Sequence, residues 1–131
     1  MTEVLLFSDD EEIFNLTNSV IDGRYKLTWC TYESLGKKLY PYPDIVIMHF
    51  DKEMVKKGTF KTIVQVKGRL GQRIPILALM EEGTPQNIFS TLLAGAYDYL
   101  EIAESSEEYR KKIEDIARWN WYLGKYGLKE K

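Results

Sequence analysis

Short apolar stretches alternate along this chain with longer segments of helical periodicity. Five stretches have the length and composition of buried strands, at residues 4–7, 25–30, 44–50, 75–79 and 97–100. The third and fourth are almost continuously apolar, which is typical of strands covered on both faces, so we expect them at the centre of a sheet. The alternation predicts βα units that fold into one parallel sheet.

Helical segments follow these strands. The segment after the first strand ends at Gly23 and presents one apolar face, formed by Ile13, Leu16 and Val20. Residues 32–39, which stop before a Pro-Tyr-Pro sequence, predict a second and shorter helix. Residues 60–70 contain several β-branched residues that suit either a helix or a strand, and the βα alternation favours a helix.

Two helices have clear start signals. Thr84 is expected to cap a helix that begins at Pro85 and reaches about residue 95. Ser105 and Glu108 have the spacing of a capping box, and the last helix that they begin is expected to end near residue 124 or 127. The sequence therefore predicts a five-stranded, doubly wound α/β domain over residues 1–127, with a tail at 128–131.

Composition narrows the classes of function. A chain of 131 residues fits one domain, and 18 basic against 20 acidic residues provide no broad positive field for nucleic acid or anionic lipid. With one cysteine, Cys30, and one histidine there is no Cys/His metal cluster, and a lone thiol suits a reducing cytoplasm. No apolar run approaches the roughly 20 residues of a membrane span. We expect a cytoplasmic domain that binds neither nucleic acid nor membranes.

Four strand-and-turn segments resemble those of response-regulator receiver domains from two-component signalling. They are VLLFSDD at 4–10, PDIVIMH at 43–49, PILALM at 75–80 and AGAYDYL at 94–100. The first six residues of the second segment and the whole of the fourth are the most specific matches, and the resemblance spans nearly the whole chain. It implies a flavodoxin-like (βα)5 receiver fold, with the working site in the crevice at the carboxyl ends of the strands.

The resemblance also shows what this chain has changed. A working receiver has two acidic residues after the first strand, a phosphoacceptor aspartate ending the third, a hydroxyl residue ending the fourth and a lysine after the fifth. These positions fall on Ser8 and Asp9, His49, Met80 and Ile102. Imidazole has no carboxylate to form an acyl phosphate, and a thioether and an alkyl group supply neither a donor nor a charge. The resemblance therefore implies a pseudo-receiver that is no enzyme and needs no Mg²⁺, with the family's switch aromatic kept as Tyr99.

Several residues at this site have more than one interpretation. Asp51 follows His49 by two residues, so it is either a displaced phosphoacceptor or, as we favour, a solvated loop acid. His49 is a pH sensor, a phosphohistidine or, as we favour, an imidazole that bonds to Asp9 or Asp10 and fills the old pocket. Asp9 and Asp10 either hold a divalent cation weakly or cap a helix, and capping is favoured.

The last helix carries two apolar stripes. The core stripe is formed by Tyr109, Ile113, Ile116 and Ala117, whereas a second stripe is formed by Trp119, Tyr122 and Tyr126. Exposed aromatic residues at helical spacing favour a partner surface, and the competing interpretation is that the helix end folds over its own domain. In receivers, the face formed by the fourth helix, fifth strand and fifth helix is the usual dimer and output surface, so the resemblance implies a homodimer or a protein partner there.

The leading hypothesis is a non-catalytic signalling module that works by protein–protein contact, with a histidine kinase or an output domain as a possible partner. A second hypothesis is a receiver that a histidine kinase phosphorylates on Asp51. A third is a flavodoxin-like binder of a small ligand, although the acidic run at residues 8–12 would repel a phosphate group. A hydrolytic triad is not favoured, because the single histidine has no nucleophile in a G-x-S-x-G turn.

Overall fold

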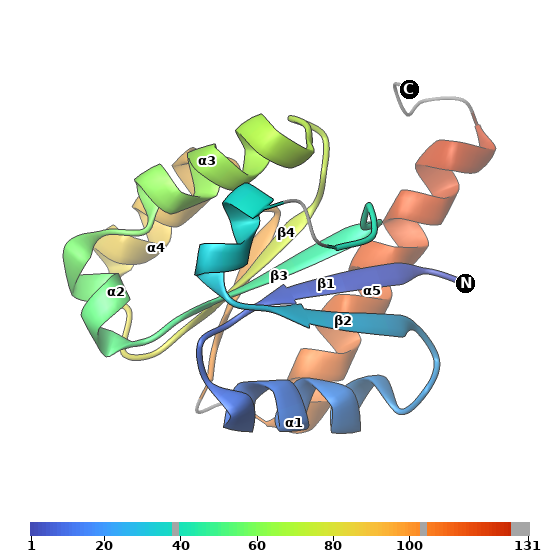
Figure 1. Cartoon of the computed structure of the whole chain (residues 1–131), viewed down its shortest axis with the longest axis horizontal. Helices are drawn as coiled ribbons and strands as arrows, with labels where there is room; N and C mark the ends of the chain where they lie inside the picture. Colours follow the sequence, from blue (N-terminus) through green and yellow to red (C-terminus); the bar gives the residue numbers. More distant parts are fainter. Residues whose placement is uncertain (38–39, 103–104, 127–131) are drawn as a thin grey trace.

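The computed structural model describes residues 1–37, 40–102 and 105–126. Within these residues the chain forms one five-stranded parallel sheet of order β2-β1-β3-β4-β5 (Figure 1). The strands are β1 (Glu3–Phe7), β2 (Lys26–Cys30), β3 (Ile45–Phe50), β4 (Ile76–Met80) and β5 (Asp98–Glu101). The predicted strands and the parallel sheet are confirmed, and β1 joins β3 and β4 as an inner strand because it pairs with both β2 and β3.

Helices connect the strands and follow the last one. They are α1 (Glu11–Ile21), the 3₁₀ helix η1 (Tyr32–Lys37), α2 (Lys52–Lys57), α3 (Phe60–Leu70), α4 (Pro85–Leu93) and α5 (Ser106–Lys125). The helix expected at 32–39 is thus a 3₁₀ helix, and residue 39 lies outside the described residues. α2 was not predicted, because six residues are too few to show helical periodicity.

Two layers of helices cover the sheet. α1 and α5 lie against one face and α2, α3 and α4 against the other (Figure 1). Because side chains alternate along a strand, β3 supplies Met48 to the cluster under α2 to α4 and Ile47 to the cluster under α1 and α5. All six residues of β3 are buried, as expected for the central strand of a doubly wound sheet.

The predicted helix starts are largely confirmed. Thr84 caps α4 in a reciprocal capping box with Asn87, and Pro85 occupies the first turn. At the start of α5, Ser105 Oγ accepts a hydrogen bond of 3.3 Å from the backbone N–H of Glu108, which is the serine half of the expected box. α5 ends at Lys125, between the two predicted ends, and the tail at 128–131 lies outside the described residues. No helix in the described ranges has the length and apolar character to cross a membrane.

Candidate functional site

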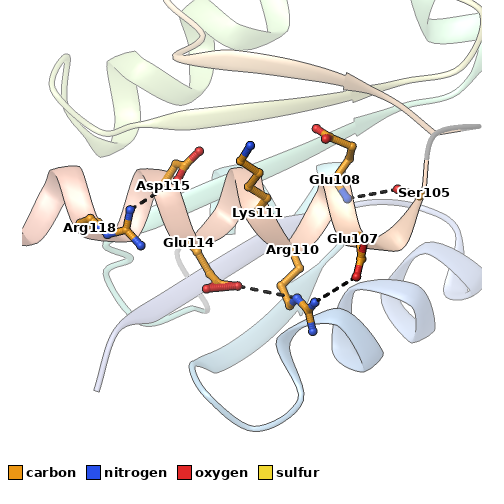
Figure 2. A pocket seen from close by; sticks show the side chains of 8 residues that line it. All are labelled: Ser105, Glu107, Glu108, Arg110, Lys111, Glu114, Asp115 and Arg118. Atoms are coloured by element: carbon orange, nitrogen blue, oxygen red, sulfur yellow. Dashed lines mark hydrogen bonds and ion pairs between the residues drawn. The ribbon is translucent and has the colours of Figure 1, made fainter.

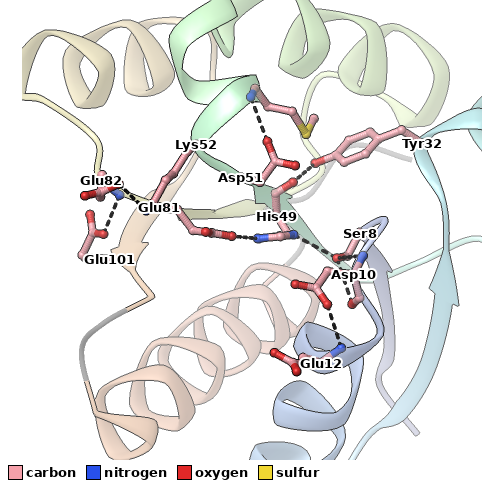
Figure 3. A network of polar contacts seen from close by, with 11 residues as sticks. Ser8, Asp10, Glu12, Tyr32, His49, Asp51, Lys52, Glu81, Glu82 and Glu101 are labelled. Atoms are coloured by element: carbon pink, nitrogen blue, oxygen red, sulfur yellow. Dashed lines mark hydrogen bonds and ion pairs between the residues drawn. The ribbon is translucent and has the colours of Figure 1, made fainter.

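Three polar side chains meet at the carboxyl ends of the inner strands. Ser8 follows β1, His49 lies near the end of β3 and Glu81 follows β4 (Figure 3). Each lies two residues beyond an apolar residue of the cluster under α1 and α5, namely Leu6, Ile47 and Leu79. Because strand side chains repeat every two residues, the three polar groups continue the same rows and share one face of the sheet.

The three groups form a hydrogen-bonded chain. Ser8 Oγ lies 2.9 Å from His49 Nδ1, and His49 Nε2 lies 2.7 Å from Glu81 Oε2. Because an ionised carboxylate only accepts, Nε2–H donates to Glu81, and a neutral ring then accepts the Ser8 hydroxyl proton at Nδ1. Ser8 and His49 are buried, whereas Glu81 is partly exposed. The expectation that the imidazole bonds to Asp9 or Asp10 is therefore wrong, since its partners are Ser8 and Glu81.

The two aspartates after β1 have separate roles. Asp10 Oδ1 accepts from the backbone N–H of Glu12 at 2.9 Å and caps α1, which confirms the capping interpretation for this residue. Asp9 is exposed, and its Oδ1 accepts from the backbone N–H of Tyr32 at 3.2 Å. Within the part of the chain that the structure describes, no three His, Cys, Asp or Glu residues are grouped so that they could hold a metal ion.

Asp51 is a helix cap. Its Oδ1 accepts from the backbone N–H of Met54 at 2.9 Å, and the side chain lies at the N-terminus of α2 (Figure 3). β3 ends at Phe50, and Asp51 is the residue that joins this strand to α2. Asp51 lies in the connection between β3 and α2, as expected for a loop acid, but its carboxylate is partly buried and caps α2.

The two remaining changed positions are apolar and lie on opposite faces of the sheet. Met80 is buried in the cluster under α2 to α4, where its Sδ lies 3.6 Å from Thr91 Oγ1. Thr91 in turn lies 2.6 Å from the hydroxyl of Thr59. Ile102 packs against the other cluster, beside Leu16 and Tyr109. Neither side chain offers a charge or a strong hydrogen-bond donor to the carboxyl edge of the sheet.

Further acidic groups surround this edge of the sheet. Glu101 Oε1 accepts from the backbone N–H of Glu82 at 2.8 Å, and Lys52 Nζ lies 3.0 Å from Glu82 Oε2. The hydrogen bond to Glu82 raises the pKa of Lys52. Lys52 is the one cation among the residues labelled in Figure 3, and it is already paired. The edge therefore has an excess of carboxylates, which disfavours an added anion.

Two tyrosines pack against the cluster on the face of the sheet covered by α2 to α4. The Tyr32 hydroxyl donates to the backbone carbonyl of His49 at 2.7 Å, and burial raises the pKa of Tyr32 well above its usual range. Tyr99, the residue at the switch position, is partly buried against the same cluster. Lys112 Nζ lies 6.0 Å from the centre of its ring and 2.8 Å from Asp98 Oδ2. The role of Tyr99 as a switch stays a prediction.

The chain of Ser8, His49 and Glu81 has the composition of a hydrolytic triad but not its accessibility. Ser8 has no exposed surface, and its Oγ also accepts from the backbone N–H of Asp10 at 3.0 Å. A nucleophile needs space for a substrate carbonyl beside its oxygen, and this oxygen is enclosed by protein partners. The arrangement thus closes the edge of the sheet and ties three strands together. Glu81 was missed from the sequence, although it lies two residues beyond Leu79 on the face that His49 also occupies.

The second candidate region is the aromatic stripe of α5, formed by Trp119, Tyr122 and Tyr126. These side chains are 46%, 45% and 57% exposed, which confirms their predicted exposure. The Trp119 and Tyr122 rings stack with centroids 5.9 Å apart, and those of Tyr122 and Tyr126 lie 4.6 Å apart. Their role as a partner surface stays a prediction.

Other exposed apolar groups were not predicted. Trp121 is 61% exposed on a different side of α5, where Lys125 Nζ lies 4.9 Å from its ring centre. Phe89 and Leu93 of α4 and Tyr97 before β5 are also exposed. The sequence did not identify them, because periodicity alone does not separate every buried apolar position from an exposed one.

A hollow along the outer surface of α5 is a solvated charged face (Figure 2). Its side chains pair along the helix, with Arg110 Nε 3.7 Å from Glu114 Oε1 and Arg118 Nη1 3.8 Å from Asp115 Oδ1. Exposed pairs at this spacing contribute little stability and leave no converging set of groups for a ligand. This hollow is therefore not a candidate site.

Comparison with solved structures identifies the fold of this chain, whereas comparison of sequences finds no relative. No protein-family model and no curated protein matches the sequence. A CheY-like protein (TadZ) from Pseudomonas aeruginosa superposes with a TM-score of 0.72 at 11% identity, over 88% of this chain and 99% of that one. A two-component response regulator from Clostridium difficile gives 0.73 at 16% identity, over 90% and 97%. NtrX from Brucella abortus gives 0.76 at 14% identity, over 97% of this chain but 29% of its own. At these identities the likeness concerns structure, and it shows that the chain has the fold of a CheY-like response-regulator receiver domain.

Proposed function

We propose that this chain is a pseudo-receiver, a signalling module that acts through contact with other proteins and not through aspartyl phosphoryl transfer. The observation that carries the proposal is the environment of His49. This residue occupies the family's acceptor position, and both of its ring nitrogens already have partners in Ser8 and Glu81. Both ring nitrogens are therefore already engaged in hydrogen bonds within the protein.

The surroundings support the same conclusion. Phosphoryl transfer depends on positive charge and hydrogen-bond donors around the transferred group. Here the hydroxyl position is Met80, the lysine position is Ile102, and the nearby Lys52 is paired with Glu82. An anion placed at this edge would meet carboxylates without a countercharge. Mg²⁺ chemistry and enzymatic activity are accordingly no part of the proposed function.

The partners are proposed to be proteins of cytoplasmic signalling. Receiver domains communicate with kinases, output domains or second copies of themselves, and the chain spans 29% of the NtrX chain that it resembles. The exposed aromatic stripe of α5 is the surface that we propose for such contact, because Tyr and Trp dominate the binding energy of protein interfaces. The contact face formed by α4, β5 and α5 is part of this proposal.

Acetyl phosphate with Mg²⁺ tests the absence of phosphoryl transfer. We expect the intact mass to stay unchanged, both for the native chain and for the matched variant Asp51→Asn. A gain of about 80 Da, the mass of one phosphoryl group, that disappears in Asp51→Asn would overturn the proposal in favour of a displaced acceptor. A gain that persists in that variant but disappears in His49→Gln would overturn it in favour of a phosphohistidine.

Sedimentation equilibrium tests the stripe as a self-association surface. We expect a dimer that the double variant Trp119→Ala/Tyr122→Ala converts to monomer and that the control Trp121→Ala leaves intact. A native chain that is monomeric at every concentration would refute homodimerisation through this face. A dimer that survives the double variant would place the contact on another surface.

A further inference from the structure

The hydroxyl of Ser8 lies within reach of two hydrogen-bond acceptors. Its Oγ is 2.9 Å from His49 Nδ1 and 3.3 Å from the backbone carbonyl oxygen of Asp10 (Figure 3). The same Oγ accepts a hydrogen bond of 3.0 Å from the backbone N–H of Asp10. A hydroxyl has one hydrogen to donate and two lone pairs with which to accept. The Ser8 hydroxyl therefore has two alternative directions, one toward the ring and one toward the carbonyl.

This geometry suits both protonation states of His49. In the neutral ring, Nε2 donates to Glu81 Oε2 at 2.7 Å, and Nδ1 accepts the Ser8 hydroxyl. When Nδ1 gains a proton it becomes a donor, so Ser8 Oγ accepts from it and the hydroxyl turns to the carbonyl of Asp10. Neither state leaves one of these buried groups without a partner. A fixed donor in the place of Ser8, such as a backbone N–H, would allow the neutral state alone.

The charges at this edge favour a cation. A protonated ring would form an ion pair with the carboxylate of Glu81, which is partly exposed. Among the described residues in the connections and first helical turns at this end of the sheet, the charged side chains are acidic except for Lys52, which lies 3.0 Å from Glu82. The acidic ones besides Glu81 are Asp9, Asp10, Glu11, Glu12, Glu33, Asp51, Glu53, Glu82, Glu101, Glu107 and Glu108. The edge that disfavours an added anion thus supplies countercharge for a proton.

Ser8 also connects the ring to the outer surface of the molecule. Its backbone carbonyl accepts from Trp29 Nε1 at 2.8 Å, and the Trp29 ring stacks on Phe14 of α1 with the centroids 5.0 Å apart. The carbonyl of Asp10, which is the second acceptor for the Ser8 hydroxyl, accepts from the backbone N–H of Ile13 at 3.1 Å in the first turn of α1. Trp29 is 37% exposed. A change in the direction of one hydroxyl therefore acts on the start of α1 and on a surface side chain of β2.

We propose that His49, Ser8 and Asp10 form a proton-linked switch. As the ring gains a proton at Nδ1, the Ser8 hydroxyl turns from His49 to the carbonyl of Asp10, and the start of α1 and Trp29 respond. One proton is taken up from solvent, Ser8 keeps its own hydrogen, and no covalent bond between heavy atoms changes. The inference goes beyond the proposed function, because it concerns protonation of the carboxyl edge and not the contact of α5 with a partner. It gives this edge a response to pH that needs no phosphoryl transfer.

An NMR titration of the native chain from pH 8 to pH 5 tests the switch. His49 is the single histidine of the sequence, so its imidazole signals have one possible assignment. We expect the ring to change from one protonated nitrogen, Nε2, to two across the range in which imidazole groups change charge. The backbone amide of Asp10 and the indole signal of Trp29 should move with the same midpoint. A ring that stays neutral down to pH 5, or that titrates while Asp10 and Trp29 stay still, would overturn the proposal. Changes that spread over the whole spectrum with that midpoint would also overturn it, because they would show that acid unfolds the chain.

Three variants identify the parts of the switch. Ser8→Ala removes the turning hydroxyl, so His49 should still titrate while the signals of Asp10 and Trp29 no longer follow it. Glu81→Gln keeps an acceptor for Nε2 but removes the charge that pairs with a protonated ring, so the midpoint should move to lower pH by about one pH unit. The control Asp22→Asn makes the same carboxylate-to-amide change at the other end of α1 and should leave the midpoint and the coupled shifts unchanged. Coupled shifts that persist in Ser8→Ala, or a midpoint that is unchanged in Glu81→Gln, would refute the switch.

Discussion

The side chains at the carboxyl edge of the sheet and those of the aromatic stripe of α5 differ in burial and in the contacts that the protein provides for them. At the edge, Ser8 and His49 are buried, and every buried side-chain nitrogen or oxygen in the described part of the chain has a partner. On α5, the rings of Trp119, Tyr122 and Tyr126 stack on one another but remain about half exposed. Apolar surface in water carries a free-energy gain on burial, whereas satisfied polar groups carry little. The comparison indicates that the exposed rings of α5 have more to gain from a new contact than the hydrogen-bonded side chains at the carboxyl edge.

The largest expected effect tests whether the edge is structural. His49→Ala removes a buried ring and two hydrogen bonds, so we expect the free energy of unfolding to fall by about 3 kcal/mol. Urea denaturation monitored by tryptophan fluorescence measures the change, and the exposed Asn15→Ala on α1 is a matched control expected to stay within about 0.5 kcal/mol. A loss below about 1 kcal/mol for His49→Ala would mean that the hydrogen-bonded chain of Ser8, His49 and Glu81 contributes little to stability. The carboxyl edge would then not be the structural region that the comparison with α5 assumes.

An intermediate effect compares the two sides of α5. On the buried side, the Tyr109 hydroxyl lies 2.6 Å from Thr17 Oγ1, which itself donates to the carbonyl of Ile13. Tyr109→Phe removes one buried hydrogen bond and should cost about 1 kcal/mol. Tyr122→Phe on the exposed side should cost less than about 0.5 kcal/mol. Similar losses for both variants would show that the hydroxyl of Tyr109 is not what joins α1 to α5.

The buried hydroxyl of Tyr109 also predicts that the free energy of unfolding depends on pH in the alkaline range. Burial raises the pKa of Tyr109 in the folded state above the value of about 10 in an unfolded chain. The folded state therefore retains this proton more strongly, so the stability is fully present below about pH 10 and is lost as the pH rises above that value. Tyr109→Phe should lose stability less steeply in this range, with Tyr32, whose pKa burial also raises, maintaining part of the slope. Identical slopes in urea titrations from pH 8 to 11 would contradict this assignment.

The smallest expected effect on stability belongs to the stripe. Trp119→Ala/Tyr122→Ala should change the free energy of unfolding by no more than about 1 kcal/mol, since both rings lie largely outside the core. Its effect on association should be much larger than its effect on folding. A loss of stability comparable to that of His49→Ala would show that the stripe supports the fold, and the two regions would then no longer differ in kind.

The sequence predicted the architecture well because strands and helices leave local patterns. The apolar run of β3 and the Thr84-Pro85 start of α4 are readable from neighbouring residues alone, and both are confirmed. The resemblance to receivers also indicated the correct edge of the sheet and brought Ser8 and His49 to one site. These successes depend on short-range signals or on an ordered series of segments.

The errors concern contacts between segments far apart in the chain. Glu81 is 32 residues from His49, so nothing in its own neighbourhood marks it as the imidazole's partner. The cap that Asp51 forms with Met54 was missed for a different reason, because α2 is only six residues long and so too short to be recognised from the sequence. The choice between partners such as Asp10 and Glu81 is made by side-chain direction at the end of each strand. That information exists only once the strands are aligned.

The hydrogen-bonded chain of Ser8, His49 and Glu81 joins the ends of three strands through residues that lie 41 and 32 positions apart in the sequence. Local opening at the end of any one of these strands must break at least one hydrogen bond to a neighbouring strand. The amide hydrogens at the ends of β1, β3 and β4 should therefore exchange with solvent deuterium as one cooperative unit, and not as three segments that fray separately. An edge held in this way would make the last hydrogen bonds between β1, β3 and β4 the most slowly exchanging strand ends of the sheet.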